Sequence, residues 1–469
     1  MGKIMNTAIK SKRRDFTEGP IFSQLIFYAI PIILTALLQY CYGMADNIVV
    51  GKFSGDEFAL AAVGATAELT RLMTNLLMGV GAGAGIIVAQ AFGAGDKDKL
   101  SKAVHTSVTF SVSAGILFAF IFYFAAEPAL NLMGINPVFI DRSILYVRIT
   151  AFGVPASAIA NYSASIFRSV GDSKTPLVIL SFSGIVNVIL NLIFVVFFSM
   201  TVDGVALATV ISQYLSALLL IWELVKRKGC EYAFSFKNAG INPKILKRSL
   251  LLGIPQAIQS SALNLANVLL VSTMNTFDGY TFTAYTINCQ MQSLPDCIAV
   301  GFVVACATFT AQNYGAGNYL RIRKTLIYSL VQVATFSFII GIVIVIFNEP
   351  IAMLFMPNDS TGAEAVLYTV KKMNMIVLTS YFIVGMLQTL SSALRGLGCS
   401  ILQMILHVSG IFVTRFVWIF FVFPKIGTPT GLLLCYPVSW IITLALLGTA
   451  RFIVGKRLRR NQDGNAVKI

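Results

Sequence analysis

Hydrophobic and polar residues alternate along this chain in long blocks. Apolar runs of roughly 20 residues, the length that crosses a bilayer as a helix, are separated by short segments rich in charge, glycine or proline. Because a backbone in lipid must satisfy its own hydrogen bonds, each run is predicted to be an α-helix. We predict twelve spans, at about residues 22–46, 57–86, 104–126, 139–165, 176–199, 204–225, 249–275, 283–311, 325–347, 366–393, 400–423 and 430–452.

Composition and charge support this interpretation. The chain has 469 residues, of which 57% are hydrophobic and 12% charged, whereas a soluble domain has about 25% charged residues. The net charge of +15 does not indicate a nucleic-acid partner, because membrane proteins gather basic residues in loops on one side of the bilayer. With the N-terminus inside, 27 of the 35 Lys and Arg fall in cytoplasmic segments and six in external ones. We therefore expect a multi-pass protein of the plasma (inner) membrane with both termini cytoplasmic.

The two halves of the chain resemble one another. Four matches occur in order at offsets of 222 to 227 residues: Pro31 with Pro255, Gln90 and Gly93-Ala94-Gly95 with Gln312 and Gly315-Ala316-Gly317, Arg168 and Gly171 with Arg395 and Gly398, and Gly204 with Gly431. Such a series indicates a duplicated six-helix unit. Because six is an even number, both copies enter the membrane in the same sense, which predicts a pseudo-twofold axis along the membrane normal.

The longest predicted loop separates these halves and sets the domain boundaries. We expect a cytoplasmic N-terminal lead-in (1–20), an N-lobe (21–225), a cytoplasmic inter-lobe loop (226–248), a C-lobe (249–452) and a basic cytoplasmic C-terminal tail (453–469). The predicted fold class is an all-α integral membrane protein with two six-helix lobes. Transporters built in this way expose a substrate site alternately to the two sides of the membrane.

Together these residues resemble the multidrug and toxic compound extrusion (MATE) family of secondary transporters. The resemblance is carried by the spacing of Pro31 and Asp46, the Asp46-Asn-Ile-Val-Val-Gly51 segment, the two Gln and Gly-Ala-Gly segments, and the Arg-x-x-Gly turns. It covers about residues 15 to 452. It implies a twelve-helix antiporter that exports organic molecules, often cationic and amphipathic, in exchange for Na⁺ or H⁺.

Asp46 is the first candidate for that coupling chemistry. It lies at the end of a long uncharged run, and a carboxylate within a span is costly unless it faces the protein interior or water. On a helix it shares one face with Gln39 and Tyr42. Pro31 removes a backbone hydrogen bond and can bend this helix. The alternative interpretation is an acid at a helix end that reaches interfacial water.

Three neutral residues could complete a site with Asp46. Asn187 and Asn191 lie one turn apart on one face of the fifth span, and Thr209 lies at similar depth in the sixth. The family resemblance implies that these positions complete an N-lobe site for Na⁺ or a proton, and a hard cation needs several oxygen ligands. The amides could instead serve helix packing. Some relatives carry a second acid where Asn191 stands, so a mechanism with two carboxylates is disfavoured.

Substrate candidates are more scattered. We consider Gln39, Tyr42, Glu68, Asn264 and Asp296 for the substrate cavity. Glu68 could instead pair with Arg71 on its own helix, and Asp296 could pair with Arg415. The seventh span offers only neutral polar groups, so coupling is expected in the N-lobe. The glycine run from Gly79 to Gly85 is expected to permit close helix approach.

The predicted function is therefore multidrug efflux of the kind that confers antibiotic resistance, by Na⁺ or H⁺ antiport with alternating access. We expect small amphipathic substrates, a monomer, and no cofactor other than the coupling ion. One alternative is a lipid-linked saccharide flippase of the same superfamily, which favours a cationic cavity. An intramembrane enzyme is disfavoured, because no cluster of catalytic or metal-ligating groups occurs in any span or loop.

Overall fold

The protein is helical throughout the part that the structure describes. The computed structural model describes residues 15–356 and 362–462, and these ranges contain helices and loops but no strand. Eleven helices are long and apolar enough to cross a membrane, and the number becomes twelve if the bent pair α13 (Ala363–Val377) and α14 (Tyr381–Gly396) is one span. The predicted all-α membrane fold is confirmed. Residues 1–14 of the predicted lead-in and 463–469 of the predicted tail lie outside the described ranges, whereas residues 453–462 of that tail continue the last helix, α19 (Cys435–Gln462).

The chain forms two compact units, and the boundaries fall inside helices. Unit 1 contains residues Leu34–Ala257, and unit 2 contains Phe16–Ile33 and the chain from Ile258 onward. Helix α2 (Ile21–Phe53) therefore contributes its first part to unit 2 and its remainder to unit 1. Helix α9 (Pro243–Met274) does the reverse. The predicted lobes, 21–225 and 249–452, differ from these units in the assignment of those two helix segments. The predicted inter-lobe loop, 226–248, belongs to unit 1, and α9 begins within it.

The two divided helices change units just after their prolines. The unit boundary follows Pro31 by two to three residues in α2, and it follows Pro255 by the same interval in α9. Proline lacks a backbone N–H and weakens the helix at this point, so the segment before it can pack with different neighbours from the segment after it. The two prolines that match in the sequence thus also mark the same structural feature, a helix that passes from one unit to the other.

The two matching glutamines, Gln90 and Gln312, each make a long-range hydrogen bond within their own unit. In unit 1, Arg248 at the start of α9 donates to Oε1 of Gln90 at 2.9 Å. In unit 2, the Phe16 amide donates to Oε1 of Gln312 at 3.1 Å. Gln90 therefore binds a residue in the first part of α9, and Gln312 binds the segment just before α2.

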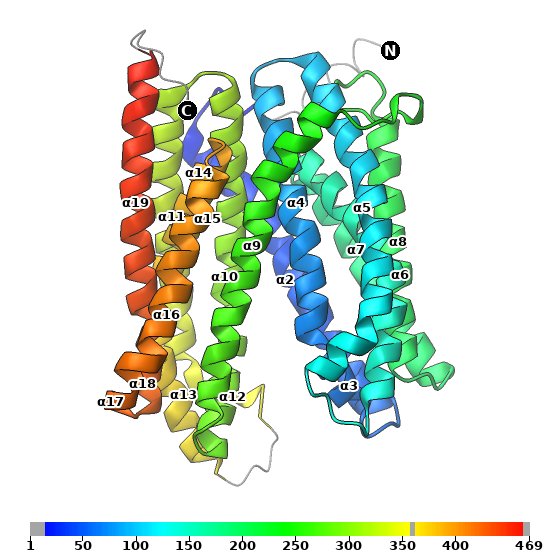
Figure 1. The fold of residues 1–469 in the computed structure, drawn as a ribbon, viewed down its shortest axis with the longest axis vertical. Helices are drawn as coiled ribbons and strands as arrows, with labels where there is room; N and C mark the ends of the chain where they lie inside the picture. Colours follow the sequence, from blue (N-terminus) through cyan, green and yellow to red (C-terminus); the bar gives the residue numbers. More distant parts are fainter. Residues whose placement is uncertain (1–14, 357–361, 463–469) are drawn as a thin grey trace. The chain divides into compact units, whose positions relative to one another are not determined.

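Helices of unit 1 pack closely through small residues. The remaining helices of this unit are α3 (Ala59–Ala65), α4 (Ala67–Gly93), α5 (Lys97–Leu132), α6 (Ile140–Ser169), α7 (Lys174–Leu192) and α8 (Val202–Lys226). Of these, α5, α6 and α8 run side by side (Figure 1). An added Cβ at Gly83 of α4 would lie 2.4 Å from the Ser249 carbonyl oxygen on α9. Ser169 of α6 donates to the Gly85 carbonyl at 2.7 Å, so the glycine run lets two helices approach α4 closely.

Unit 2 is built in the same way from the second half of the chain. Its other helices are α10 (Gly279–Gly315), α11 (Tyr319–Ile346), α12 (Asn348–Met353), α13, α14, α15 (Ser400–Val408), α16 (Thr414–Val417), α17 (Phe423–Ile426), α18 (Pro429–Leu433) and α19 (Cys435–Gln462). Phe16 is fully buried here, and its ring stacks on Phe309 with centroids 3.8 Å apart. The segment just before α2 is thus anchored in this unit.

The repeated glycines adopt the same backbone conformation in both units. Gly95 and Gly317 have φ of 67° and 73°, and Gly171 and Gly398 have φ of 87° and 89°. Left-handed φ values of this kind favour glycine because it has no Cβ. The sequence repeat therefore reflects repeated helix ends and not chance composition.

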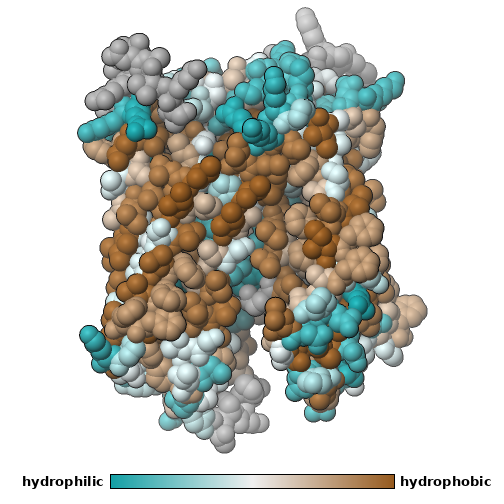
Figure 2. All heavy atoms as spheres, in the orientation of Figure 1, coloured by the Kyte–Doolittle hydropathy of each residue, from teal (hydrophilic) through white to brown (hydrophobic). Residues whose placement is uncertain are grey.

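Apolar side chains cover the outside of the helices. In Figure 2, hydrophobic residues occupy the middle of the visible surface and hydrophilic residues gather at its two ends. On α5, Phe120 and Phe124 are 62% and 69% exposed, which would be unfavourable in water and suits contact with lipid tails.

Candidate functional site

The candidate coupling residues lie on three helices of unit 1. Asp46 belongs to the second part of α2, Asn187 and Asn191 to α7, and Thr209 to α8. Helix α7 has two distinct faces, because Asn187 and Asn191 are 6% and 0% exposed whereas Ile185 and Ile189 are 52% and 50% exposed. The two amides therefore point into the unit, and the isoleucines lie on its surface.

A continuous chain of hydrogen bonds joins the four residues. The Asn191 side-chain amide donates to Oδ1 of Asp46 and, at 3.3 Å, to Oδ1 of Asn187. Asn187 in turn donates to Oγ1 of Thr209 at 3.5 Å, and the Thr209 hydroxyl donates to the Val205 carbonyl at 2.9 Å. The predicted set is thus brought together by the fold, in the order acid, amide, amide, hydroxyl.

One oxygen in this hydrogen-bonded network has no partner among the described residues. Oδ1 of Asn191 is buried and has no hydrogen-bond partner among the described residues. A buried polar atom without a partner costs about 1 to 3 kcal/mol, and most such atoms in folded proteins are paired. The site therefore offers an acceptor oxygen next to a carboxylate, an arrangement suited to a small cation or a proton.

A tyrosine that the sequence does not mark interacts electrostatically with the acid. Tyr146 of α6 is close enough to Asp46 for an electrostatic interaction between the two side chains. Its ring packs against the apolar cluster around Val50 and Val205. Nothing in the spacing of the fourth span singles out Tyr146, because its position depends on how α6 packs against the other helices.

Tyr42 makes a structural contact. Its hydroxyl donates to the Ser181 carbonyl on α7 at 3.1 Å. A Cβ at Gly184 would lie 2.0 Å from the Tyr42 ring, so this glycine makes room for the ring. Tyr42 therefore couples α2 to α7 one turn before Asp46, while Gln39 on the same helix is exposed.

The other substrate candidates do not gather within either unit. Gln39, Tyr42 and Glu68 belong to unit 1, and Asn264 and Asp296 belong to unit 2. The side chain of Glu68 lies outside the described part of the chain, so its proposed pairing with Arg71 is untested. Asn264 is partly exposed on α9.

Asp296 has neutral partners, contrary to one of the two expectations for it. It accepts hydrogen bonds from Tyr381 at 3.3 Å and from Gln388 at 3.5 Å, both on α14. Arg415 instead donates to Oδ1 of Asn267 at 2.7 Å and lies over the Tyr436 ring at 4.4 Å. The expected pair of Asp296 with Arg415 is therefore wrong for the described residues, because α16 directs Arg415 toward α9 and α19.

Fold and site together define a polytopic helical membrane protein with an acid-centred polar site inside one of two repeated units. Comparison with known proteins agrees. The MatE family model matches residues 31–193 and 255–421, which lie in the two halves of the chain. The chain belongs to the MatE family, whose members are membrane transporters. The prediction of a transporter and not an enzyme is thereby confirmed.

Individual relatives match along nearly the whole chain. The probable multidrug resistance protein YoeA of Bacillus subtilis (strain 168) is 26% identical, with 94% of this chain and 96% of that protein covered. The probable multidrug resistance protein NorM of Thermotoga maritima is 26% identical, with 84% of each chain covered. A crystal structure of MATE in complex with MaL6 has a TM-score of 0.88 at 19% identity and covers 95% of this chain and 99% of that one. This last likeness shows a shared fold.

Proposed function

We propose that this protein is a secondary active transporter that exports drugs or other amphipathic, often cationic organic compounds by antiport with Na⁺ or H⁺. The names of the relatives as multidrug resistance proteins support the substrate class. The two repeated units support an alternating-access mechanism. We place the protein in the plasma (inner) membrane as a monomer with both termini cytoplasmic, and with no cofactor besides the coupling ion.

The observation that carries this proposal is the Asp46 site. A carboxylate inside a span is bonded to a fully buried asparagine whose own carbonyl oxygen has no partner among the described residues. A merely structural acid would be expected to complete its network, because half-satisfied buried networks are unfavourable. A site that gains and loses an ion must leave an acceptor for that ion.

The same atoms suit either coupling ion. For Na⁺, the carboxylate of Asp46, the carbonyl oxygens of Asn187 and Asn191, and the hydroxyl of Thr209 supply one negative charge and several hard oxygen ligands. For a proton, a protonated Asp46 becomes a hydrogen-bond donor, and the free Asn191 oxygen is an acceptor beside it. In both cases Pro31 lies in the same helix, where it can let α2 bend as the charge changes.

Dye efflux from proteoliposomes tests the proposal. The purified protein would be reconstituted and given an imposed Na⁺ gradient or, separately, a pH gradient of the same driving force. Efflux that is driven by one gradient and abolished by its collapse is expected, and the effective gradient names the ion. Efflux that ignores both gradients would contradict antiport.

A further inference from the structure

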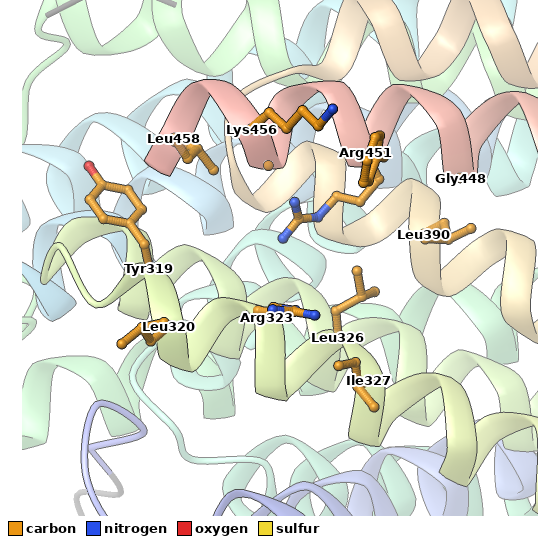
Figure 3. Close-up of a pocket in the computed structure, with 12 residues that line it drawn as sticks. Tyr319, Leu320, Arg323, Leu326, Ile327, Leu390, Gly448, Arg451, Lys456 and Leu458 are labelled. Carbon is orange, nitrogen blue, oxygen red and sulfur yellow. The ribbon is translucent and has the colours of Figure 1, made fainter. Parts of the chain in front are cut away.

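A basic cavity lies in unit 2, in the opposite half of the sequence from the coupling residues. It has a volume of about 350 Å³ and lies between α11, α14 and α19 (Figure 3). It occurs where α11 begins and α19 ends, the end of the unit predicted to face the cytoplasm. Three cations line it, Arg323, Arg451 and Lys456, together with apolar side chains such as Leu326.

The positive charge of this cavity has no acidic counterpart in its walls. Helices α11, α14 and α19 contain no Asp or Glu. The salt bridges of the described residues do not involve any of the three cations. Lys456 lies over the Phe452 ring at 4.5 Å, which stabilises it only in part.

Arg451 is the most buried of the three cations and lacks a hydrogen-bond acceptor for its Nε among the described residues. The residue is 9% exposed, and its buried Nε makes no hydrogen bond among the described residues. Figure 3 shows its guanidinium directed from α19 toward α11, where Arg323 lies. A buried guanidinium without an acceptor is costly. A Cβ at Gly455 would lie 3.0 Å from Nη1, so this glycine leaves room for the group.

The walls around these cations indicate the kind of anion that fits. Leu320, Ile327 and Phe452 line the cavity and are 71%, 47% and 63% exposed. They continue the apolar surface that faces lipid, so an acyl chain can lie against them. Guanidinium groups bind phosphate through paired N–H donors, and basic pockets between membrane helices on the cytoplasmic side suit acidic lipid headgroups.

The geometry points to a binding site for the phosphate headgroup of an anionic phospholipid, held by Arg451 and Arg323 with Lys456 at the rim. Its acyl chains follow the apolar face of α11 and α19. This site is separate from the Asp46 chemistry, which belongs to unit 1. The experiment that tests this lipid site measures lipid retention, which does not depend on transport activity.

Native mass spectrometry of the purified full chain would measure retention of phosphatidylglycerol against phosphatidylcholine with the same acyl chains. The variants are Arg451→Gln, Arg323→Gln and Gly448→Leu. A Cβ at Gly448 meets no atom within 4 Å, so leucine there enters the cavity without a clash at its first atom. Arg457→Gln is the matched control, because Arg457 is exposed on the same helix and does not line the cavity.

We expect wild-type protein to retain phosphatidylglycerol preferentially. Arg451→Gln and Arg323→Gln should each weaken retention about tenfold or more, the effect of losing a charged hydrogen bond. Gly448→Leu should do the same by filling the space, and Arg457→Gln should weaken retention by no more than about fivefold. If Arg451→Gln does not fold, the exposed Arg323 and the cavity-filling Gly448→Leu still decide the matter.

Four results would overturn the inference. Equal retention of the two lipids by wild type would show no headgroup selection. Loss in Arg457→Gln as large as in Arg323→Gln, or full retention in Gly448→Leu, would show general surface attraction. Displacement of phosphatidylglycerol by millimolar inorganic phosphate would assign the cavity to a soluble anion and not to a lipid.

Discussion

Corresponding regions of the two units carry opposite charge. In unit 1, Asn191 of α7 donates to the carboxylate of Asp46 on α2. In unit 2, the residue 224 positions after Asn191 is Arg415, the same offset that relates Pro31 to Pro255. Arg415 donates to Asn267 of α9 at 2.7 Å, and Asn267 lies one helical turn before the position that matches Asp46.

The third helix of each site follows the same relation. Thr209 and Ser212 of α8 are matched 227 residues later by Tyr436 and Ser439 of α19, the offset between Gly204 and Gly431. Tyr436 lies under the Arg415 guanidinium at 4.4 Å, and Ser439 is 3.5 Å from its Nε. In unit 2, the positive side chain of Arg415 therefore occupies the position of Asn191. In unit 1, Asn191 binds a carboxylate and has a carbonyl oxygen without a partner among the described residues. The same helical arrangement can therefore form an ion site in unit 1, whereas in unit 2 the arginine side chain fills the corresponding space.

The largest effect is expected from Asp46→Asn. Removing the negative charge should weaken binding of the coupling ion by about 10-fold to 150-fold, because a hydrogen bond or ligand to a charged group contributes about 1.5 to 3 kcal/mol. Ion-driven efflux in proteoliposomes should be lost while membrane insertion is normal. Asp278→Asn is the control, since Asp278 is an exposed N-cap of α10 and asparagine caps helices equally well. Wild-type efflux in Asp46→Asn would contradict the central claim.

Converting unit 2 to the charge pattern of unit 1 should have the next largest effect. The double change Arg415→Asn with Asn267→Asp removes the attached cation and supplies a carboxylate. In an Asp46→Asn background, this variant should regain stabilisation by the coupling cation, about 1.4 kcal/mol at ten times its dissociation constant. Thermal unfolding with and without the ion would measure it. If Arg415→Asn alone gained the same stabilisation by the cation, the new carboxylate would not be needed, and the proposed correspondence between the two units would be wrong.

Substitution of the amides should have graded effects. Asn191→Ala removes the donor to the carboxylate and should weaken ion dependence about tenfold, whereas Asn187→Ala removes neutral bonds and should weaken it about fivefold. The ion concentration for half-maximal efflux would be measured. Asn161→Ala is the matched control, because among the described residues Asn161 donates only within its own helix, to the Ser157 carbonyl at 2.9 Å and to the Ser157 hydroxyl. An unchanged ion dependence in Asn191→Ala would remove this residue from the site.

The smallest effect is expected from Tyr42→Phe. Loss of the bond to the Ser181 carbonyl should lower the free energy of unfolding by about 1 kcal/mol and leave the KM for dyes unchanged. Thermal unfolding and efflux kinetics would be measured on the same preparation. A raised KM for several dyes with unchanged stability would instead place Tyr42 in the substrate path.

Much of the fold follows from the chain alone. The apolar runs locate the helices because lipid demands about 20 apolar residues per span and internal backbone bonding. The repeat is readable because glycines at helix ends, such as Gly171 and Gly398, have φ values that other residues rarely adopt. The inward face of α7 is readable from the spacing of Asn187 and Asn191, since both lie one turn apart.

What the sequence could not supply are relations between helices distant along the chain. The sequence does not show that the first part of α2 packs in unit 2, that Tyr146 interacts electrostatically with Asp46, or that Arg415 contacts Asn267 and not Asp296. Each depends on helix rotation and packing, which local periodicity leaves free. The sequence thus determined the spans, the duplication and the residues available for chemistry. Only the tertiary structure decided which of them meet, because side-chain partners in a bundle are fixed by contacts between segments far apart in the chain.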